Sequence, residues 1–247
     1  MNPTIVSTHS HPLQVSFVVP AWNEALVIGE CVRSIRNAAD AAARTYEVVV
    51  VDDSSDDGTG DAARDAGARV VRVQRRQIAA VRNAGAAATS APWLVFVDAD
   101  TTLSPELVTA AYAALDAGAV GGGARVTLDR MPSSWIVRAT TALFMFVWER
   151  LDMAAGCFVF CRRDVFHRVG GFDERYFATE ETWFSEAMKA QGRFVVLKES
   201  AMTSARKLRQ DSALRLIWTN LRILAGGTRQ WRRREGLEFW YDGRRGG

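Results

Sequence analysis

Short apolar runs alternate with stretches of helical spacing through the first half of the chain. The apolar runs predict strands at residues 14–19, 46–51, 69–73 and 93–97. Between them, apolar positions recur every three or four residues, or alanine dominates, and these stretches predict helices over 26–35, 60–66, 78–88 and 105–115. Ser104 followed by Pro105 is a typical helix start. Strands that alternate with helices in this way indicate an α/β domain with a parallel sheet.

The second half is less regular. Residues 120–128 predict another strand, and 133–151 predict a helix whose apolar run, 139–148, is too short to cross a bilayer of ~30 Å. Residues 212–225 carry Leu and Ile at helical spacing with arginines between them, which predicts an amphipathic helix. Its apolar face fits either the domain surface or a membrane surface.

Acidic side chains follow three of the predicted strands. The run Leu94–Val97 shows no polar alternation, as expected of a strand buried on both faces, and it stops at Asp98 and Asp100. Asp52 and Asp53 end the second strand, and Glu24 follows Pro20, which closes the first, and Asn23, which can cap the next helix. The carboxyl ends of parallel strands share one rim, where α/β proteins bind ligands. We therefore expect a site for a divalent cation and phosphates there, the alternative being ordinary polar turns.

No glycine-rich phosphate loop accompanies these acids. The dinucleotide pattern G-x-G-x-x-G does not follow the first strand, and the G-x-x-x-x-G-K-S/T pattern occurs nowhere in the chain. Phosphate must then be held by a metal and by a cationic side chain. Arg82, shortly before the Asp98 strand, is the candidate for that cation.

In order and spacing, these motifs resemble those of the inverting glycosyltransferases of family 2, which have the GT-A fold: a mostly parallel central sheet with helices on both faces. The resemblance covers about residues 14–200 and includes Arg82-Asn83-x-Gly85. It implies a nucleotide-diphosphate sugar donor and a Mg²⁺ or Mn²⁺ ion. By this resemblance, Asp100 and Asp98 bind the metal, Asp98 also holds the ribose, Arg82 faces the diphosphate, and the nucleoside is bordered by Pro20, Ala21, Glu24, Asp52 and Asp53.

The acceptor half is similar to the family as well. Met153–Arg163 resembles its small-residue acceptor strand, and Gly170–Glu174 resembles its Gly-Gly-Phe-Asp-Glu turn. Glu181 takes the place of the family's general base, with Glu180 as the alternate, although Glu181 replaces the shorter Asp usual there. An inverting displacement needs a carboxylate to take the acceptor hydroxyl proton. Both glutamates also suit the first turn of any helix, here predicted over 182–190.

Two further features concern the reaction. The Gln-x-x-Arg-Trp motif of processive synthases is missing, which predicts transfer of one sugar at a time. Arg206 and Lys207 follow the core where the family often closes over the nucleotide, so they are candidates for a diphosphate clamp, the alternative being a surface loop.

Charge is unevenly distributed. The net charge is +3, but residues 204–247 hold eleven Arg or Lys against four acids, so that the tail carries +7 and the first 203 residues carry −4. We divide the chain into a flexible tail (1–12), a catalytic domain (13–203, with a nucleotide-binding half 13–118 and an acceptor half 119–203) and a basic helical tail (204–247). The basic tail suggests an anionic partner: a membrane surface, a phosphorylated acceptor or another chain. It favours a membrane-associated or lipid-linked acceptor, or peripheral membrane contact, although a solvated helix explains it equally. No nucleic-acid partner is expected.

Three cysteines without nearby ligand residues fit a reducing compartment. Since residues 1–12 carry no secretory pattern, we expect a cytoplasmic protein, with the inner face of the membrane as an alternative site. Two other functions stay open: a nucleotidyltransferase, which shares a similar scaffold, and a noncatalytic protein that binds sugar nucleotides.

Overall fold

The computed structural model describes residues 12–130, 138, 154–177 and 179–206. The predicted helices at 133–151 and 212–225, the basic tail beyond Arg206 and most of the N-terminal tail lie outside the described residues. The elements, in chain order, are β1 (Val15–Ala21), α1 (Ala25–Ala41), β2 (Tyr46–Asp52), α2 (Thr59–Asp65), β3 (Arg69–Arg72), α3 (Ile78–Ala87), β4 (Trp93–Val97), β5 (Thr101–Thr102), α4 (Pro105–Asp116), β6 (Gly121–Leu128), β7 (Phe158–Arg162), α6 (Arg163–Val169), α7 (Glu180–Lys189) and β8 (Phe194–Thr203).

One sheet runs through the described residues, in the order β3-β2-β1-β4-β7-β6-β8-β5. Strands β3, β2, β1 and β4 are parallel neighbours, as are β6 and β8. Strand β7 runs antiparallel to both β4 and β6, and β5 runs antiparallel to β8. The sheet is therefore mixed but mostly parallel, which confirms the predicted fold class.

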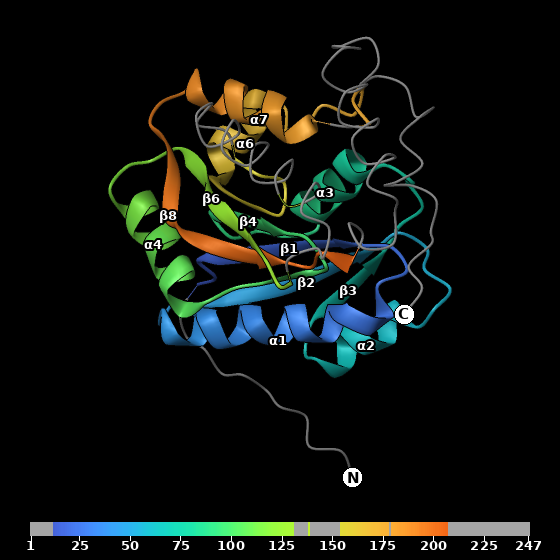
Figure 1. Cartoon of the computed structure of the whole chain (residues 1–247). Helices are drawn as coiled ribbons and strands as arrows, with labels where there is room; N and C mark the ends of the chain where they lie inside the picture. The colour runs from blue at the N-terminus through green and yellow to red at the C-terminus, as the bar shows by residue number, and fades with distance from the viewer. Residues whose placement is uncertain (1–11, 131–137, 139–153, 178, 207–247) are drawn as a thin grey trace.

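Helices cover both faces of this sheet (Figure 1). Helices α1 and α4 pack against the face that carries Phe17 of β1 and Val95 of β4, whereas α3, α6 and α7 pack against the face that carries Val18 and Phe96. Because successive strand residues point to opposite faces, burial on both sides requires an apolar residue at every position. This explains the unbroken apolar run that the sequence shows before Asp98.

The predicted elements of residues 14–128 are each present, with bounds within two residues of those expected except at the end of α1, which continues six residues beyond the predicted 35 to Ala41. Two local expectations were wrong. Strand β1 continues through Pro20 to Ala21, because Pro20 takes a place in the register opposite Val51. Ser104 does cap α4, its side chain accepting a hydrogen bond from the Leu107 amide, but Asn23 does not cap α1.

The start of α1 is capped from a distant loop instead. Asn23 has a φ of 54°, and its side-chain oxygen accepts a hydrogen bond from the Asp56 amide. The Asp57 carboxylate accepts from the Ala25 amide at 3.0 Å, and the Thr59 hydroxyl accepts from the Glu24 amide at 2.8 Å. The acidic loop after β2 thus satisfies the free amides at the start of α1, which a helix cannot pair internally.

Helix α3 lies directly on the sheet because it contains Gly85. A Cβ at Gly85 would lie 2.3 Å from Val18 Cγ1 and 2.8 Å from Val51 Cγ2. We expect Gly85→Ala to lower the free energy of unfolding by about 1–3 kcal/mol, because added volume in a packed core forces neighbours apart. Urea unfolding, followed by circular dichroism, measures this change.

Gly29→Ala in α1 is the matched control. A Cβ at Gly29 would meet mainly the flexible end of Arg33, at 3.1 Å. We expect this variant to be more stable than the parent by about 0.5–1 kcal/mol, because alanine favours a helix over glycine. Equal effects of the two substitutions would contradict the close packing of α3 on the sheet.

Candidate active site

The acidic rim predicted from the sequence is present. Strand β1 lies between β2 and β4 and is parallel to both, so that the segments following the three strands leave at one edge of the sheet (Figure 1). Glu24 follows β1, Asp52 is the last residue of β2 and Asp53 follows it, and Asp98 and Asp100 follow β4.

Asp52 and Asp53 hold the loops of this rim. Both side chains are buried. Asp53 accepts hydrogen bonds from the amides of Arg75 (2.6 Å) and Arg76 (2.7 Å), and Asp52 accepts from the Ser55 amide at 2.9 Å. These bonds shape the loops after β2 and β3, which border the predicted nucleoside site, and direct contact of either acid with a nucleoside stays a prediction.

The loop after β3 also brings a cation to this side of the rim. The Arg76 guanidinium carbon lies 4.4 Å from the centre of the Trp22 ring, a cation–π contact. Arg75 and Arg76 were not predicted as site residues. The paired arginines directly after a predicted strand were the signal available.

Asp98 and Asp100 are both partly exposed. The Asp98 side chain is 30% exposed, and its Oδ1 accepts a hydrogen bond from Arg82 at 2.9 Å. The Asp100 Oδ1 lies 3.3 Å from the Thr203 hydroxyl, and the Asp100 carbonyl accepts from the Ser204 amide. The last residues of β8 therefore lie against Asp100.

Over the ranges that the structure describes, no three His, Cys, Asp or Glu side chains converge in a group that could hold a metal ion by themselves. Two accessible carboxylates nevertheless suit Mg²⁺ or Mn²⁺. Such an ion commonly takes one or two protein carboxylates and completes its shell with water and substrate phosphates. The donor set at Asp98 and Asp100 fits that pattern.

Arg82 is buried between the residues that follow β4, the residues that precede β7 and the start of α7. Its Nη1 donates to Glu180 Oε1 at 2.8 Å, and its Nη2 donates to Asp98 Oδ1 and to the Gly156 carbonyl, each at 2.9 Å. Burial alone would lower the pKa of this guanidinium, but the nearby carboxylates, Asp98 first, outweigh it and raise the pKa above its ordinary value. With both terminal nitrogens bonded to the protein, the predicted contact with a diphosphate stays a prediction.

Glu180 and Glu181 form the first turn of α7. Glu180 is buried against Arg82, whereas Glu181 is partly exposed. Burial, opposed by the charge of Arg82, raises the pKa of Glu180. Burial and then the charge of Glu180 raise the pKa of Glu181 to about 8. Of the two, Glu181 is the carboxylate with access to a substrate and with the proton affinity of a general base.

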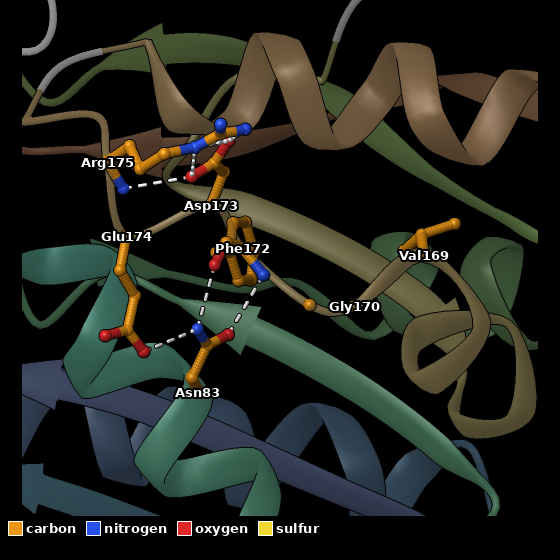
Figure 2. A pocket seen from close by; sticks show the side chains of 8 residues that line it. Asn83, Val169, Gly170, Phe172, Asp173, Glu174 and Arg175 are labelled. Carbon is orange, nitrogen blue, oxygen red and sulfur yellow. Dashed lines mark hydrogen bonds and ion pairs between the residues drawn. The ribbon is translucent and has the colours of Figure 1, made fainter.

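Two polar side chains, Asn83 next to Arg82 and Gln77 at the start of α3, connect α3 to residues 172–176. The Asn83 side chain donates to the Phe172 carbonyl (2.8 Å) and to Glu174 Oε1 (3.0 Å), and it accepts from the Phe172 amide (2.9 Å), as Figure 2 shows. The Gln77 side chain donates to the carbonyls of Glu174 and Tyr176. Asn83 belongs to the motif noted in the sequence, but its partners there were not predicted.

Figure 2 shows side chains that line a pocket beside this turn. The volume of this pocket is about 370 Å³. Its polar side chains are already paired with one another: Arg175 binds Asp173 through two nitrogens, and Asn83 binds the turn. The pocket therefore lies where α3 meets the turn that contains Phe172.

Arg206 reaches back to the start of the rim. Its side chain forms an ion pair with Glu24, and both side chains are largely buried. The structure therefore places Arg206 beside the residues predicted to border the nucleoside. Its role as a diphosphate clamp stays a prediction, and Lys207 lies outside the described residues.

A family comparison decides the class of this site. The model of "Glycosyl transferase family 2" matches residues 16–170. The chain belongs to this family. In this family 2 glycosyltransferase the matched range includes the rim acids and Arg82, and it ends at Gly170, before Glu180 and Glu181.

Curated relatives agree with the family. The chain is 36% identical over 135 residues to the succinoglycan biosynthesis protein ExoO of Rhizobium meliloti (strain 1021), covering 53% of this chain and 36% of that protein. It is 32% identical over 111 residues to the validoxylamine A glucosyltransferase of Streptomyces hygroscopicus subsp. jinggangensis (strain 5008), covering 42% of this chain and 26% of that protein. The matches thus span about a third or less of these relatives.

Solved structures agree with the fold. The mannosyltransferase PcManGT from Pyrobaculum calidifontis, in complex with GDP-Man and Mn²⁺, superposes with a TM-score of 0.65 at 20% identity, over 85% of this chain and 62% of that one. TarS of S. aureus (residues 1–349) superposes with a TM-score of 0.60 at 18% identity, over 79% of this chain and 61% of that one. These similarities confirm the GT-A fold.

No helix in the described part of the chain has the length and apolar content needed to span a bilayer. The predicted contacts of the basic tail with a membrane concern residues beyond Arg206 and are not addressed by this finding.

The raised pKa of Glu181 predicts a pH dependence. A general base acts when it is ionised, so we expect kcat/KM to rise with pH, to reach half its maximum near pH 8 and to level off above that pH. A carboxylate with a raised pKa binds its proton more tightly in the folded protein than in the unfolded one. Its contribution to stability therefore falls as the pH rises from ~4.3 towards 8. Initial rates and urea unfolding across pH 5–9 measure both trends, and a rate that falls over this range contradicts the assignment.

Proposed function

We propose that this chain is a metal-dependent, inverting, non-processive glycosyltransferase, which transfers one sugar from a nucleotide-diphosphate sugar to an acceptor hydroxyl. The observation that carries the proposal is the juxtaposition at Arg82, which bonds to Asp98 on the donor side and to Glu180, next to Glu181, on the acceptor side. A displacement in one step needs a leaving-group site and a base on opposite sides of the reacting carbon.

Each group of site residues has a separate role in the proposed reaction. Asp98 and Asp100 would hold a Mg²⁺ or Mn²⁺ ion, which when bound offsets negative charge on the departing nucleotide diphosphate. The loops shaped by Asp52 and Asp53, together with Pro20, Ala21 and Glu24, border the nucleoside. Glu181 takes the proton of the acceptor hydroxyl as its oxygen attacks the anomeric carbon. Glu180 is held by Arg82 and positions the first turn of α7.

Known proteins of similar fold support the donor class. A structure of TarS contains UDP-GlcNAc, and that of the Pyrobaculum mannosyltransferase contains GDP-Man with Mn²⁺. A lipid-linked acceptor is supported by 30% identity over 112 residues to an undecaprenyl-phosphate 4-deoxy-4-formamido-L-arabinose transferase of Enterobacter sp. (strain 638), covering 42% of this chain and 34% of that protein. It is also supported by the basic tail, and it would place the enzyme in the cytoplasm at the inner face of the membrane.

A thermal-shift screen of nucleotide sugars tests the proposal. One donor, at 100 times its Kd, should stabilise the protein by ~2.7 kcal/mol in the presence of Mn²⁺. Excess chelator should abolish the shift. The stabilising donor is then incubated with polyprenyl phosphates and simple glycosides, and the transferred sugar is identified together with its anomeric configuration.

Other outcomes would assign another function. Release of pyrophosphate from a nucleoside triphosphate and a sugar phosphate would indicate a nucleotidyltransferase. Donor binding without hydrolysis or transfer across the acceptor panel would indicate a binding protein. A retained anomeric configuration in the product would contradict the inverting displacement.

A further inference from the structure

Arg82 is a fully buried charged side chain in the middle of the domain. It is 1% exposed, and its guanidinium carbon lies 5.2 Å from the centre of the Phe172 ring. Phe172 in turn stacks on Phe184 of α7, with the ring centres 4.3 Å apart. The cation is thus held between the end of β4, the turn at Phe172 and the helix that carries Glu181.

The polar contacts of Arg82 join these elements. Asp98 belongs to the segment after β4, Gly156 precedes β7, and Glu180 opens α7. Removal of one partner of a buried cation leaves a buried charge that is costly to the fold. The Arg82 side chain therefore fixes the positions of Asp98, Gly156 and Glu180 relative to one another.

Glu181 faces the same cation across Gly156. A Cβ built on Gly156 would lie 3.3 Å from Arg82 Nη2 and 3.5 Å from the Glu181 carboxyl carbon. Gly156 does not have a positive φ, so its backbone conformation does not require glycine. Since glycine has no side chain, the bare backbone of Gly156 leaves the guanidinium and the Glu181 carboxyl close together.

We propose that Arg82 is a positioning residue for the base: by joining Asp98 to Glu180, it sets both the place and the ionisation of Glu181. This inference rests on the proposed function, in which Glu181 accepts the acceptor proton. It differs from the diphosphate contact predicted for Arg82, because a residue that acts through Glu180 and Glu181 changes the base rather than the affinity for the donor.

The charged groups around Glu181 determine the direction in which each substitution should shift its pKa. The charged groups that act on Glu181 are Glu180 of its own helix, Arg82 of α3 and Asp98 after β4. The cation favours the ionised form of Glu181, and the two carboxylates oppose it. Loss of the Arg82 charge must therefore raise the pKa of Glu181, whereas loss of the Glu180 charge must lower it.

Arg82→Gln and Glu180→Gln test these opposite shifts. The pKa of Glu181 is read in two ways: from the pH dependence of kcat/KM, and from a ¹³C-glutamate NMR titration in which the Glu181 signal is the one that Glu181→Gln removes. We expect Arg82→Gln to move the pKa upward by about one unit or more, and Glu180→Gln to move it downward by a similar amount. Nucleotide Kd is measured in parallel and should change far less than kcat.

Arg163→Gln is the matched control. Arg163 is a partly buried arginine whose nitrogens bond to the carbonyls of Ala86 and Ala91 and to the Thr89 hydroxyl rather than to the rim acids. We expect this variant to lose stability without moving the pKa of Glu181. The double variant Arg82→Gln/Glu180→Gln, which removes both charges of the pair, should fold better than Arg82→Gln alone.

Two results would overturn the inference. One is an unchanged pKa of Glu181 in Arg82→Gln and Glu180→Gln. The other is an increase in nucleotide Kd that accounts for the whole loss of kcat/KM in Arg82→Gln, which would assign Arg82 to the diphosphate. If Arg82→Gln does not fold, Glu180→Gln decides through the predicted downward shift. The NMR titration needs no turnover, so failure of the inference and failure of the proposed function are distinguishable.

Discussion

Replacing Glu181 with glutamine is expected to lower kcat for sugar transfer by about 10²–10⁴-fold, the range that a positioned general base contributes. Glutamine keeps the size of the side chain but cannot accept the proton of the acceptor hydroxyl. Donor affinity should be unchanged, because Glu181 belongs to the acceptor side of Arg82. Steady-state rates together with isothermal titration of the donor and Mn²⁺ measure the two quantities.

Glu186→Gln provides the control for this substitution. Glu186 lies on the same helix, α7, and forms an exposed ion pair with Lys189. It should transfer sugar at the parent rate. A parent rate in Glu181→Gln, with a large loss in Glu180→Gln, would move the base to Glu180.

The second large effect is expected at Asp100. Asp100→Asn removes one of the two accessible carboxylates that would hold the metal, and we expect transfer to fall by at least about 10²-fold, since metal stabilisation of a leaving group contributes several kcal/mol. The Mn²⁺-dependent part of donor stabilisation in the thermal-shift assay should also disappear. Circular dichroism should show an unchanged fold.

Asp56→Asn is the matched control for Asp100→Asn. Asp56 is an exposed acid of the same rim, in the loop after β2. It tests whether any loss of negative charge at the rim weakens the enzyme. Parent activity in Asp100→Asn, or in excess chelator, would remove the metal from the proposed function.

The sequence was sufficient to predict the strands and the rim acids of residues 13–118, because each signal there is local. The run Leu94–Val97 shows that β4 is buried on both faces, and the acids that follow mark its end. Parallel pairing of β2 and β4 with β1 then brings Asp52 and Asp98 to the same edge of the sheet, as the structure confirms. Apart from the pairing of the strands, these two inferences need no contact between residues that are distant in the chain.

Strand β8 was not predicted, for a specific reason. Its pairing with β6 shifts between Ala124 and Arg125, so that Ala124 faces Leu197 while Arg125 faces Ser200. Lys198 and Glu199 are the residues left over on β8 at this irregularity. Their charges interrupt the apolar run and hide the strand from a pattern search.

The partners of buried polar groups were also beyond the sequence. Arg82 and Glu180 are 98 residues apart, and Asn83 and Phe172 are 89 apart. The residue types predicted a cation at Arg82 and a base at Glu180 or Glu181. They did not predict that Arg82 and Glu180 form a buried ion pair. The cap of α1 by Asp57 was missed in the same way, because Asn23 was the nearest residue of a suitable type.

The antiparallel direction of β7 has a consequence for the environment of Arg82. Strand β7 pairs with β4 so that its first residue, Phe158, lies opposite Val97, and the residues just before β7 therefore lie at the edge of the sheet where β4 ends. Gly156 is one of them, and its carbonyl accepts from the same Arg82 nitrogen as the carboxylate of Asp98. A β7 strand of the opposite direction would begin at the other edge of the sheet, and Arg82 would lose this backbone acceptor.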